Sequence, residues 1–259
     1  MVYADERMII IVVCAALAGA IIGLDRTAVG QFMISQPIVA GPLVGWMLGD
    51  ATTGLLIGTT LELVWLLDMP VGAFVPADST VSSIVATAAA IGGSHGSVQI
   101  SAIGFSVLIT VALAPVTMMA DHIARQFNAR LARNAFAPAG TDIRKTLVRA
   151  QAAGVGVFFL KSLVIYLVFI PLGVLAVRLF LGMPDMYHRA MALFIKLLPL
   201  IGVALAVRKL TIRTLDAFLI SGYVIAALMG QLFSAPALAI MPLALMGGWL
   251  GVRYREQWS

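Results

Sequence analysis

The apolar runs of this chain are longer and denser than a water-soluble core requires. Hydrophobic residues make up 61% of the 259 residues and charged residues 11%, and the mean hydropathy is +1.02. A bilayer-spanning helix needs about 20 predominantly apolar residues, and runs such as 98–120 and 152–181 reach that length. Backbone groups in lipid must pair within their own segment, and the alternation typical of membrane strands is missing from the sequence. We therefore predict an all-α polytopic membrane protein.

The N-terminal half is interrupted more often than the C-terminal half. After the run 8–24, the apolar pieces 38–48 and 55–67 are each about half of what is needed to cross a bilayer, and they end at Gly49-Asp50 and at Asp68-Met69-Pro70. Non-helical backbone at membrane depth is tolerated where protein or a water-filled cavity surrounds it. We expect re-entrant hairpins or broken helices there, then a short helix over 81–91 and a span over 98–120.

Basic residues gather in the segment 121–150. By the positive-inside rule this segment is cytoplasmic. Ile123, Phe127 and Leu131 recur every four residues, which predicts an amphipathic helix that either lies on the inner membrane face or docks a cytoplasmic partner. Pro138 and Gly140 end that helix. Asp142 can cap a second, short helix.

From residue 151 onward the apolar runs are uninterrupted, and we expect spans over 152–181, 190–207, 215–232 and 235–252. No linker separates folding units. We predict one membrane-embedded domain over 1–259, with an N-terminal half of about 1–120, the basic loop 121–150 and C-terminal helices over 151–259. The net charge of +5 resides in the loops, where membrane orientation requires it, so it does not indicate nucleic-acid binding.

Acidic residues occur where no basic residue is near in sequence. Between Arg26 and Arg125 the chain has no Lys or Arg, but it has Asp50, Glu62, Asp68, Asp78 and Asp121. An ionised carboxylate at the bilayer centre costs about 2.5–3.5 kcal/mol on insertion scales, and such residues mark substrate or ion pathways. We expect a polar ligand or a watery cavity to meet these acids.

Glu62 is the strongest candidate for substrate binding. Its sequence neighbours are apolar, and Trp65 stands three residues on, on the same helical face. A carboxylate beside an aromatic ring suits a neutral polyol, whose hydroxyls donate to the acid while an apolar face covers the ring. A structural Glu62 bonded to nearby backbone, and a Trp65 at the lipid interface, are the alternatives.

The remaining acids have plainer interpretations. Asp50 and Asp78 precede Thr52-Thr53 and Ser79-Thr80 and are expected to cap helix starts. Asp68, with Met69-Pro70, is placed at a hairpin tip. Asp25 is expected to pair with Arg26 at the membrane edge.

Enzyme signals are weak. Gly92-Gly93-Ser94-His95-Gly96 fits G-x-S-x-G, but that motif is meaningful on a strand-to-helix turn with His and acid partners. The histidines His95, His122 and His188 are scattered and lack metal-ligand spacing. We predict no catalytic residues, no metal site and no cofactor.

An ordered set of motifs carries a family resemblance. The set is Gln36-Pro37-Ile38-Val39-Ala40-Gly41-Pro42-Leu43-Val44-Gly45, Leu48-Gly49-Asp50, Thr53-Gly54, Ile57-Gly58, Thr60-Leu61-Glu62, Pro70-Val71-Gly72 and Pro76-Ala77-Asp78. It resembles the membrane component enzyme IIC of the mannose/fructose/sorbose family of the bacterial sugar phosphotransferase system, over roughly residues 8–110.

The resemblance implies a multi-pass, sugar-translocating subunit of the bacterial inner membrane. It would pair with a second membrane component of homologous fold, enzyme IID, in a trimer of heterodimers. Cytoplasmic A and B components would carry phosphate from phosphoenolpyruvate to the emerging sugar, so this chain would not itself be an enzyme.

By the same resemblance, the sugar contacts Glu62 and the hairpin Asp68, Met69, Pro70, Val71 and Gly72. Trp65 joins this pocket, and Asp25, Asp50 and Asp78 support it. Mannose-specific members carry Asn-Ile-Gly where this chain has Pro70-Val71-Gly72, which favours a sorbose-like or amino-sugar substrate.

Two other classes stay open from the residues alone. Intramembrane acids also bind ions or relay protons in ion-coupled secondary transporters. A membrane scaffold or receptor without transport is the third class.

Overall fold

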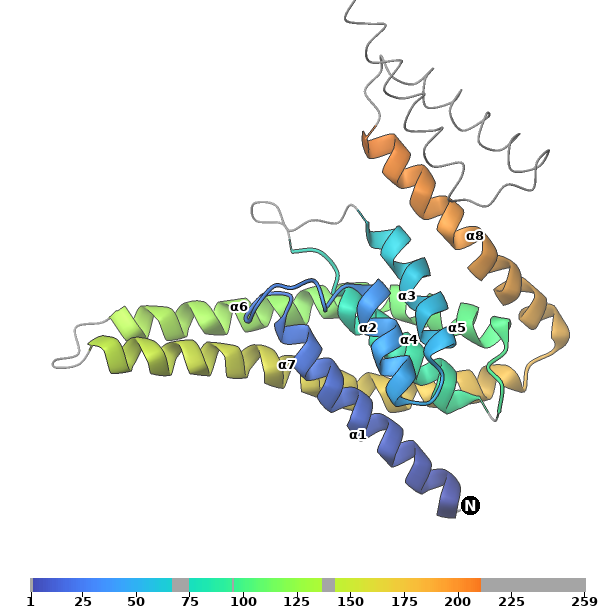
Figure 1. Ribbon diagram of the computed structural model, residues 1–259, viewed down its shortest axis with the longest axis horizontal. Coiled ribbons are helices and arrows are strands. Elements are labelled where there is room, and N and C mark those ends of the chain that lie inside the picture. The colour runs from blue at the N-terminus through green and yellow to red at the C-terminus, as the bar shows by residue number, and fades with distance from the viewer. Residues whose placement is uncertain (1, 67–74, 95, 137–142, 211–259) are drawn as a thin grey trace, which may run out of the picture. The chain divides into compact units, whose positions relative to one another are not determined.

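The computed structural model describes residues 2–66, 75–94, 96–136 and 143–210, which form α-helices and, among these residues, no strand (Figure 1). The helices are α1 (Val2–Leu24), α2 (Pro37–Met47), α3 (Ala51–Trp65), α4 (Ser79–Gly93), α5 (Ile100–Ala112), α6 (Ala114–Phe136), α7 (Ile143–Leu181) and α8 (Asp185–Leu210). The all-α prediction is confirmed. The chain divides into two compact units, Met1–Ala204 and Leu205–Ser259, and α1 to α7 belong to the first. The expected spans 215–232 and 235–252 lie outside the described residues.

Among the described residues, two helices are long and apolar enough to cross a membrane: α7, with 39 residues, and the part Asp185–Leu205 of α8. The expected second short helix after Asp142 is wrong, because α7 continues from Ile143 into the apolar run without a break. No Gly or Pro separates the basic residues 143–150 from that run, so the helix propagates through them. The predicted single domain over 1–259 stays a prediction.

The expected span over 98–120 is not one continuous helix. It consists of α5 and α6, which are bent by 44° relative to each other at Leu113. Pro115 lacks an amide hydrogen and cannot continue the ladder of α5, but it is well accommodated in the first turn of a new helix. The pair is therefore a broken span or a re-entrant loop.

Helices α2 and α3 form the short hairpin that the sequence indicated. With 11 and 15 residues, they are about 17 and 23 Å long at 1.5 Å per residue, so neither crosses a bilayer alone. Gly49 makes the turn with φ +91°. The Asp50 carboxylate then accepts hydrogen bonds from the Thr53 amide (3.0 Å) and hydroxyl (2.6 Å). The predicted capping role of Asp50 is confirmed.

Glycines four residues apart bring the two hairpin helices into backbone contact. Gly41 of α2 faces Gly54 of α3, and a Cβ added at Gly41 would lie 2.5 Å from the Gly54 carbonyl oxygen. Gly45 and Gly58 are equally crowded by the opposite helix. Small residues at this spacing let membrane helices approach closely, where dispersion contacts replace the hydrophobic driving force.

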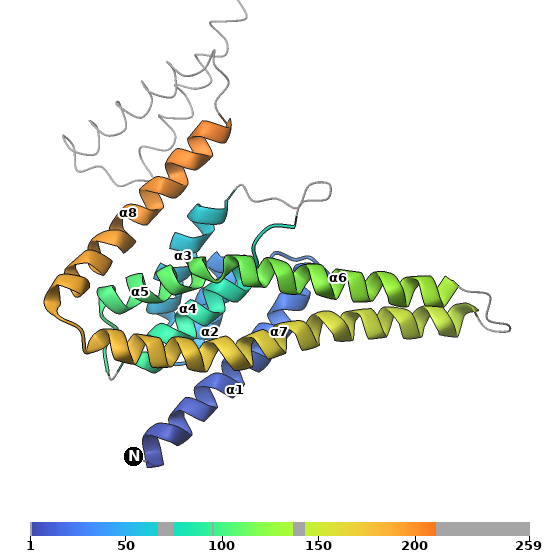
Figure 2. The same cartoon turned by 180° about the vertical axis from the view of Figure 1, so that it is seen from behind.

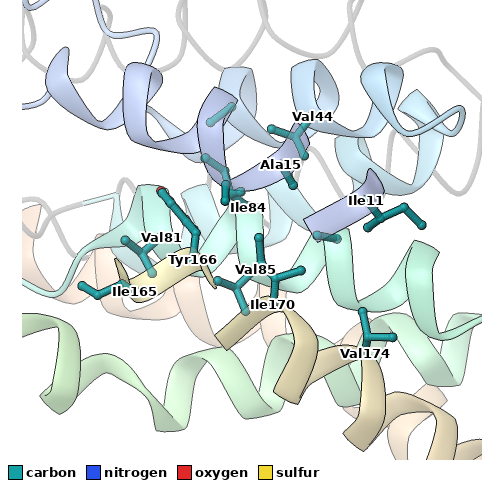
Figure 3. Packing of buried hydrophobic residues seen from close by; sticks show 13 residues of the cluster. Ile11, Ala15, Val44, Val81, Ile84, Val85, Ile165, Tyr166, Ile170 and Val174 are labelled. Carbon is teal, nitrogen blue, oxygen red and sulfur yellow. The ribbon is translucent and has the colours of Figure 1, made fainter. Parts of the chain in front are cut away.

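Helix α4 is the centre of the unit, and α1, α2, α3, α5 and α7 pack around it. It is buried on nearly all sides because it is built from Ala, Ser, Thr and small apolar residues. Figure 3 shows its side chains meeting those of α1, α2 and α7. The cluster contains Ile11, Ala15, Val44, Val81, Ile84, Val85, Ile165, Tyr166, Ile170 and Val174.

The basic segment forms a two-helix arm. Figure 2 shows α6 and the first half of α7 running side by side, and Asn128 Nδ2 donates to the Gly154 carbonyl oxygen over 3.2 Å. Ile123 and Phe127 of the expected apolar stripe remain exposed. The amphipathic character of α6 fits the prediction, and its membrane or partner contact stays a prediction.

The glycine contact can be tested by replacing Gly54 with alanine. A helix-interior Gly→Ala change normally stabilises by about 0.5–1 kcal/mol, but the methyl group here would meet the Gly41 backbone. We expect a loss of about 1–3 kcal/mol, as for overpacked cores, seen as a lower apparent melting temperature in detergent. The matched control is Gly156→Ala, whose Cβ meets nothing within 4 Å. A Gly54→Ala protein as stable as Gly156→Ala would contradict the packing argument.

Candidate functional site

Helix ends and one loop converge beside α7. The loop after α1 leads into the first turn of α2, and α4 begins next to it. Thr80 Oγ1 of α4 donates to the Ser35 carbonyl oxygen (2.7 Å), and Ser83 Oγ donates to the Pro37 carbonyl oxygen (3.3 Å). The Thr80 hydroxyl satisfies a carbonyl of the loop, and the Ser83 hydroxyl adds a second bond at the first residue of α2. Ser35, Pro37, Thr80 and Ser83 thus form a polar surface at one end of the short helices, which we call the polar floor.

Glu62 lies at this end, on the last turn of α3. Its Oε2 accepts a hydrogen bond from the Ile38 amide of α2 over 3.3 Å. The first amides of a helix have no intrahelical partner and carry partial positive charge. The start of α2 therefore stabilises the Glu62 carboxylate without a cationic side chain. Within the part of the chain that the structure describes, no Lys or Arg forms an ion pair with Glu62. One oxygen thus has a structural partner, and the carboxylate stays half-buried.

Trp65 follows three residues later and is also half-buried. It packs against the apolar cluster that contains Ile57, Leu61 and Ile103. The other predicted pocket residues, Asp68, Met69, Pro70, Val71 and Gly72, lie outside the described residues.

Asp78 has two cationic partners, which the sequence reasoning did not expect. Arg26 Nη1 donates to one carboxylate oxygen over 2.8 Å, and Lys161 Nζ donates to the other over 3.1 Å. Arg26 Nη2 also reaches the Ala77 carbonyl oxygen at 2.8 Å. The carboxylate caps α4 as predicted, accepting from the Val81 amide over 3.2 Å. The expectation that this acid lacks a basic partner is wrong, because the partners come from segments distant in sequence.

Asp121 extends the same network. Lys161 Nζ lies 3.3 Å from its Oδ1, and Arg125 Nε lies 2.8 Å from its Oδ2. Lys161 therefore bridges two carboxylates whose side chains are only 9% and 11% exposed. We call the set Arg26, Asp78, Lys161, Asp121 and Arg125 the ionic network. It joins the loop after α1 to α4, α6 and α7.

Lys161 is the network member that the sequence analysis overlooked. It stands inside the apolar run 152–181, and an ionisable residue within a span is itself a signal of a buried partner or a pathway.

Asp25 does not pair with Arg26 as expected. Its carboxylate accepts backbone hydrogen bonds from Phe32 (2.6 Å) and Ser35 (3.1 Å). The loop between them bends sharply, with φ of 83° at Gly30, 56° at Gln31 and 66° at Met33. Asp25 therefore holds the loop that presents the first turn of α2 to Glu62, and it frees Arg26 for Asp78.

Comparison with known proteins identifies a family profile and relatives that this chain matches. The sequence profile described as "PTS system sorbose-specific iic component" matches residues 7–252. The chain is 29% identical to the fructose permease IIC component of Bacillus subtilis (strain 168) over 85% of this chain and 78% of that one. It is 36% identical to the mannose-specific EIIC component of Escherichia coli (strain K12) over 46% of this chain and 40% of that one.

A solved structure titled "Structure of membrane protein" has the same fold. It aligns with a TM-score of 0.72 and 20% identity over 97% of this chain and 95% of its own. This likeness supports the helical membrane fold and nothing about chemistry.

The ionic network can be tested by replacing Lys161 with methionine. Both buried carboxylates would lose their shared cation, and breaking a buried pair costs about 3–5 kcal/mol. We expect a clear drop in the apparent melting temperature, because Asp78 and Asp121 keep only Arg26 and Arg125 as cationic partners and lose the more buried one. Lys196→Met, which removes an exposed lysine of α8, is the control. Equal melting of the Lys161 and Lys196 variants would contradict a stabilising network.

Proposed function

Because this chain belongs to the family of sorbose-specific IIC components of the sugar phosphotransferase system, we propose that Glu62 and the polar floor around it bind the sugar in transit. The chain is a sugar-translocating membrane subunit. The binding site within it is our own inference. It rests on one observation above all: Glu62 is a half-buried acid whose partner is a backbone amide, whereas Asp78 and Asp121 are neutralised by cations.

The geometry at Glu62 suits a neutral ligand with hydroxyl groups. An ionised carboxylate has about four lone-pair sites, and the Ile38 amide occupies one of them. The others can accept from two sugar hydroxyls at once, and hydrogen bonds to charged groups contribute about 1.5–3 kcal/mol each. Trp65, the last residue of α3, would cover an apolar sugar face. The hairpin Asp68 to Gly72 would complete the pocket.

The substrate that we propose is a hexose or an amino sugar. The relatives are named for fructose, mannose, sorbose and N-acetylgalactosamine. Pro70 has no amide hydrogen to offer a ligand, which favours a sorbose-like or amino-sugar preference over mannose. Asp25, Asp50 and Asp78 support the site indirectly, since they fix the loop after α1 and the starts of α3 and α4.

We further propose the surrounding system. A second membrane component of homologous fold, enzyme IID, would complete the translocation pathway in a trimer of heterodimers, in the inner membrane of a bacterium. Cytoplasmic A and B components would phosphorylate the sugar with phosphoenolpyruvate as the donor. The name "IIC component" supports this division of labour, as does the basic arm of α6 and α7, which presents a cytoplasmic surface by the positive-inside rule.

The role of Glu62 is tested with the Glu62→Gln variant, expressed with the partner subunits. The amide oxygen can still accept from Ile38, so the fold should survive, but the charge that strengthens the sugar hydrogen bonds is gone. We expect the uptake rate of the transported sugar at low concentration to fall about tenfold or more, in line with a loss of about 1.5 kcal/mol or more. Thr59→Val is the control, because the Thr59 hydroxyl bonds its own helix at Leu55. Undiminished transport by Glu62→Gln would rule out the assignment.

The energy source is tested separately. Vesicles holding the full set of components should accumulate sugar phosphate when phosphoenolpyruvate is supplied inside, and an ionophore that collapses ion gradients should leave the rate unchanged. An ion-coupled transporter would show the reverse pattern. Abolition of uptake by the ionophore would exclude the proposed system.

A further inference from the structure

A cavity of about 380 Å³ lies between the loop after α1, α6 and α7, and Glu62 is not among its lining residues. Its volume is within the range of about 300–1,000 Å³ that small-molecule sites occupy. The lining residues are Thr27, Ala28, Asn128, Ala132, Leu147, Ala150, Gln151, Gly154, Val155 and Phe158. None of them is charged, although arginines surround the arm.

The inner end of the cavity adjoins the ionic network. Thr27 follows Arg26 in the loop, Asn128 stands three residues after Arg125 on α6, and Phe158 precedes Lys161 by three residues on α7. Residues three apart are neighbours on a helix face, so the network lies beside the cavity. The rest of the lining belongs to α6, α7 and the basic segment 121–150 itself, which includes Ala132, Leu147 and Ala150. By the positive-inside rule that segment is cytoplasmic.

The chemistry of the lining is that of a site for an uncharged polar solute. Asn128 donates from Nδ2 to Gly154, and its Oδ1 is buried with no hydrogen-bond partner among the described residues. That oxygen has no accessible surface, so it is the remaining polar groups of the lining that face the cavity. Gln151 adds an amide and Thr27 a hydroxyl, while Phe158 offers an aromatic face. Amides and a hydroxyl beside an aromatic ring match a sugar, and the lack of charge disfavours a sugar phosphate.

We propose that this cavity is a second sugar subsite, on the cytoplasmic side, where the unphosphorylated sugar rests after it leaves Glu62. The inference deepens the proposed function and rests on it. A holding site here would keep the sugar at the base of the basic arm until a phosphoryl donor docks. The arginines of the arm would then meet the phosphate group, which the neutral cavity does not favour.

The test is ligand protection of an engineered cysteine. The chain has a single cysteine, Cys14, so Gln151→Cys in a Cys14→Ala background gives one reactive thiol in the cavity. Inside-out vesicles with the partner subunits are treated with a membrane-impermeant maleimide, with fructose, mannose, sorbose or N-acetylgalactosamine as the probe. At a concentration about ten times the dissociation constant, the free fraction of a site falls about tenfold, and alkylation should slow accordingly. Potassium chloride at equal osmolarity should not slow it.

Ala152→Cys is the matched control, because this exposed neighbour lies outside the lining, and its alkylation should not respond to sugar. Adding Glu62→Gln should leave the protection of Gln151→Cys intact, since the sugar enters from the cytoplasmic side. Equal alkylation with and without every sugar would overturn the subsite. So would protection that disappears with Glu62→Gln, because it would then report only on occupancy at Glu62.

Filling the cavity gives an independent measurement. Val155→Phe should lower the uptake rate severalfold at unchanged abundance in the membrane, whereas Leu160→Phe, at a position 58% exposed and outside the lining, should not. Transport by Val155→Phe at the wild-type rate would count against the subsite. Should this variant not reach the membrane, the cysteine experiment decides. Absence of sugar uptake by the wild-type complex would instead refute the proposed function itself.

Discussion

The carboxylate of Asp78 accepts hydrogen bonds from Arg26 and Lys161 while it caps α4, and much of the structure depends on this arrangement. A buried charge without a partner is very costly, so the loop after α1, the start of α4 and the middle of α7 have to meet at this point. Lys161 brings in α6 through Asp121. The ionic network thus fixes the positions of four segments that are far apart in sequence: the loop after α1, α4, α6 and α7.

Around that anchor, close packing explains how helices too short to cross a bilayer are accommodated. The glycines of α2 and α3 allow backbone contact within the hairpin, and the Ala, Ser and Thr residues of α4 allow neighbours on nearly every side. Helix ends at membrane depth need partners for their free amides and carbonyls. Asp50 and Asp78 supply partners for the first amides of α3 and α4, and Thr80 supplies one for the loop carbonyl of Ser35. Short helices are tolerated in this protein because other parts of the protein, and not lipid, surround their ends.

The same construction leaves Glu62 in a different electrostatic state from the other acids. Asp78 and Asp121 are committed to cations, and Asp25 to two backbone amides of its own loop. Glu62 has one amide contact at the positive end of α2 and remains half-buried. An acid that is oriented but incompletely satisfied is suited to a ligand that supplies donors. The neutral cavity near Lys161 is a separate feature, lined by the loop after α1, α6 and α7.

The sequence by itself determined the membrane class, the short hairpin with its turn at Gly49-Asp50, the caps at Asp50 and Asp78 and the family, because hydropathy, glycine spacing and capping are local properties. It did not reveal the break at Leu113 or the continuous α7. The first depends on whether Pro115 starts a new helix, and the second on whether the helix continues through the residues after 142. The partners of Asp78, Asp121 and Asp25 were decided by the tertiary structure alone. Arg26 and Asp78 are 52 positions apart, and Lys161 and Asp78 are 83 apart. Electrostatic pairing acts through space, so only the packing of α4 against α7 could bring those charges together.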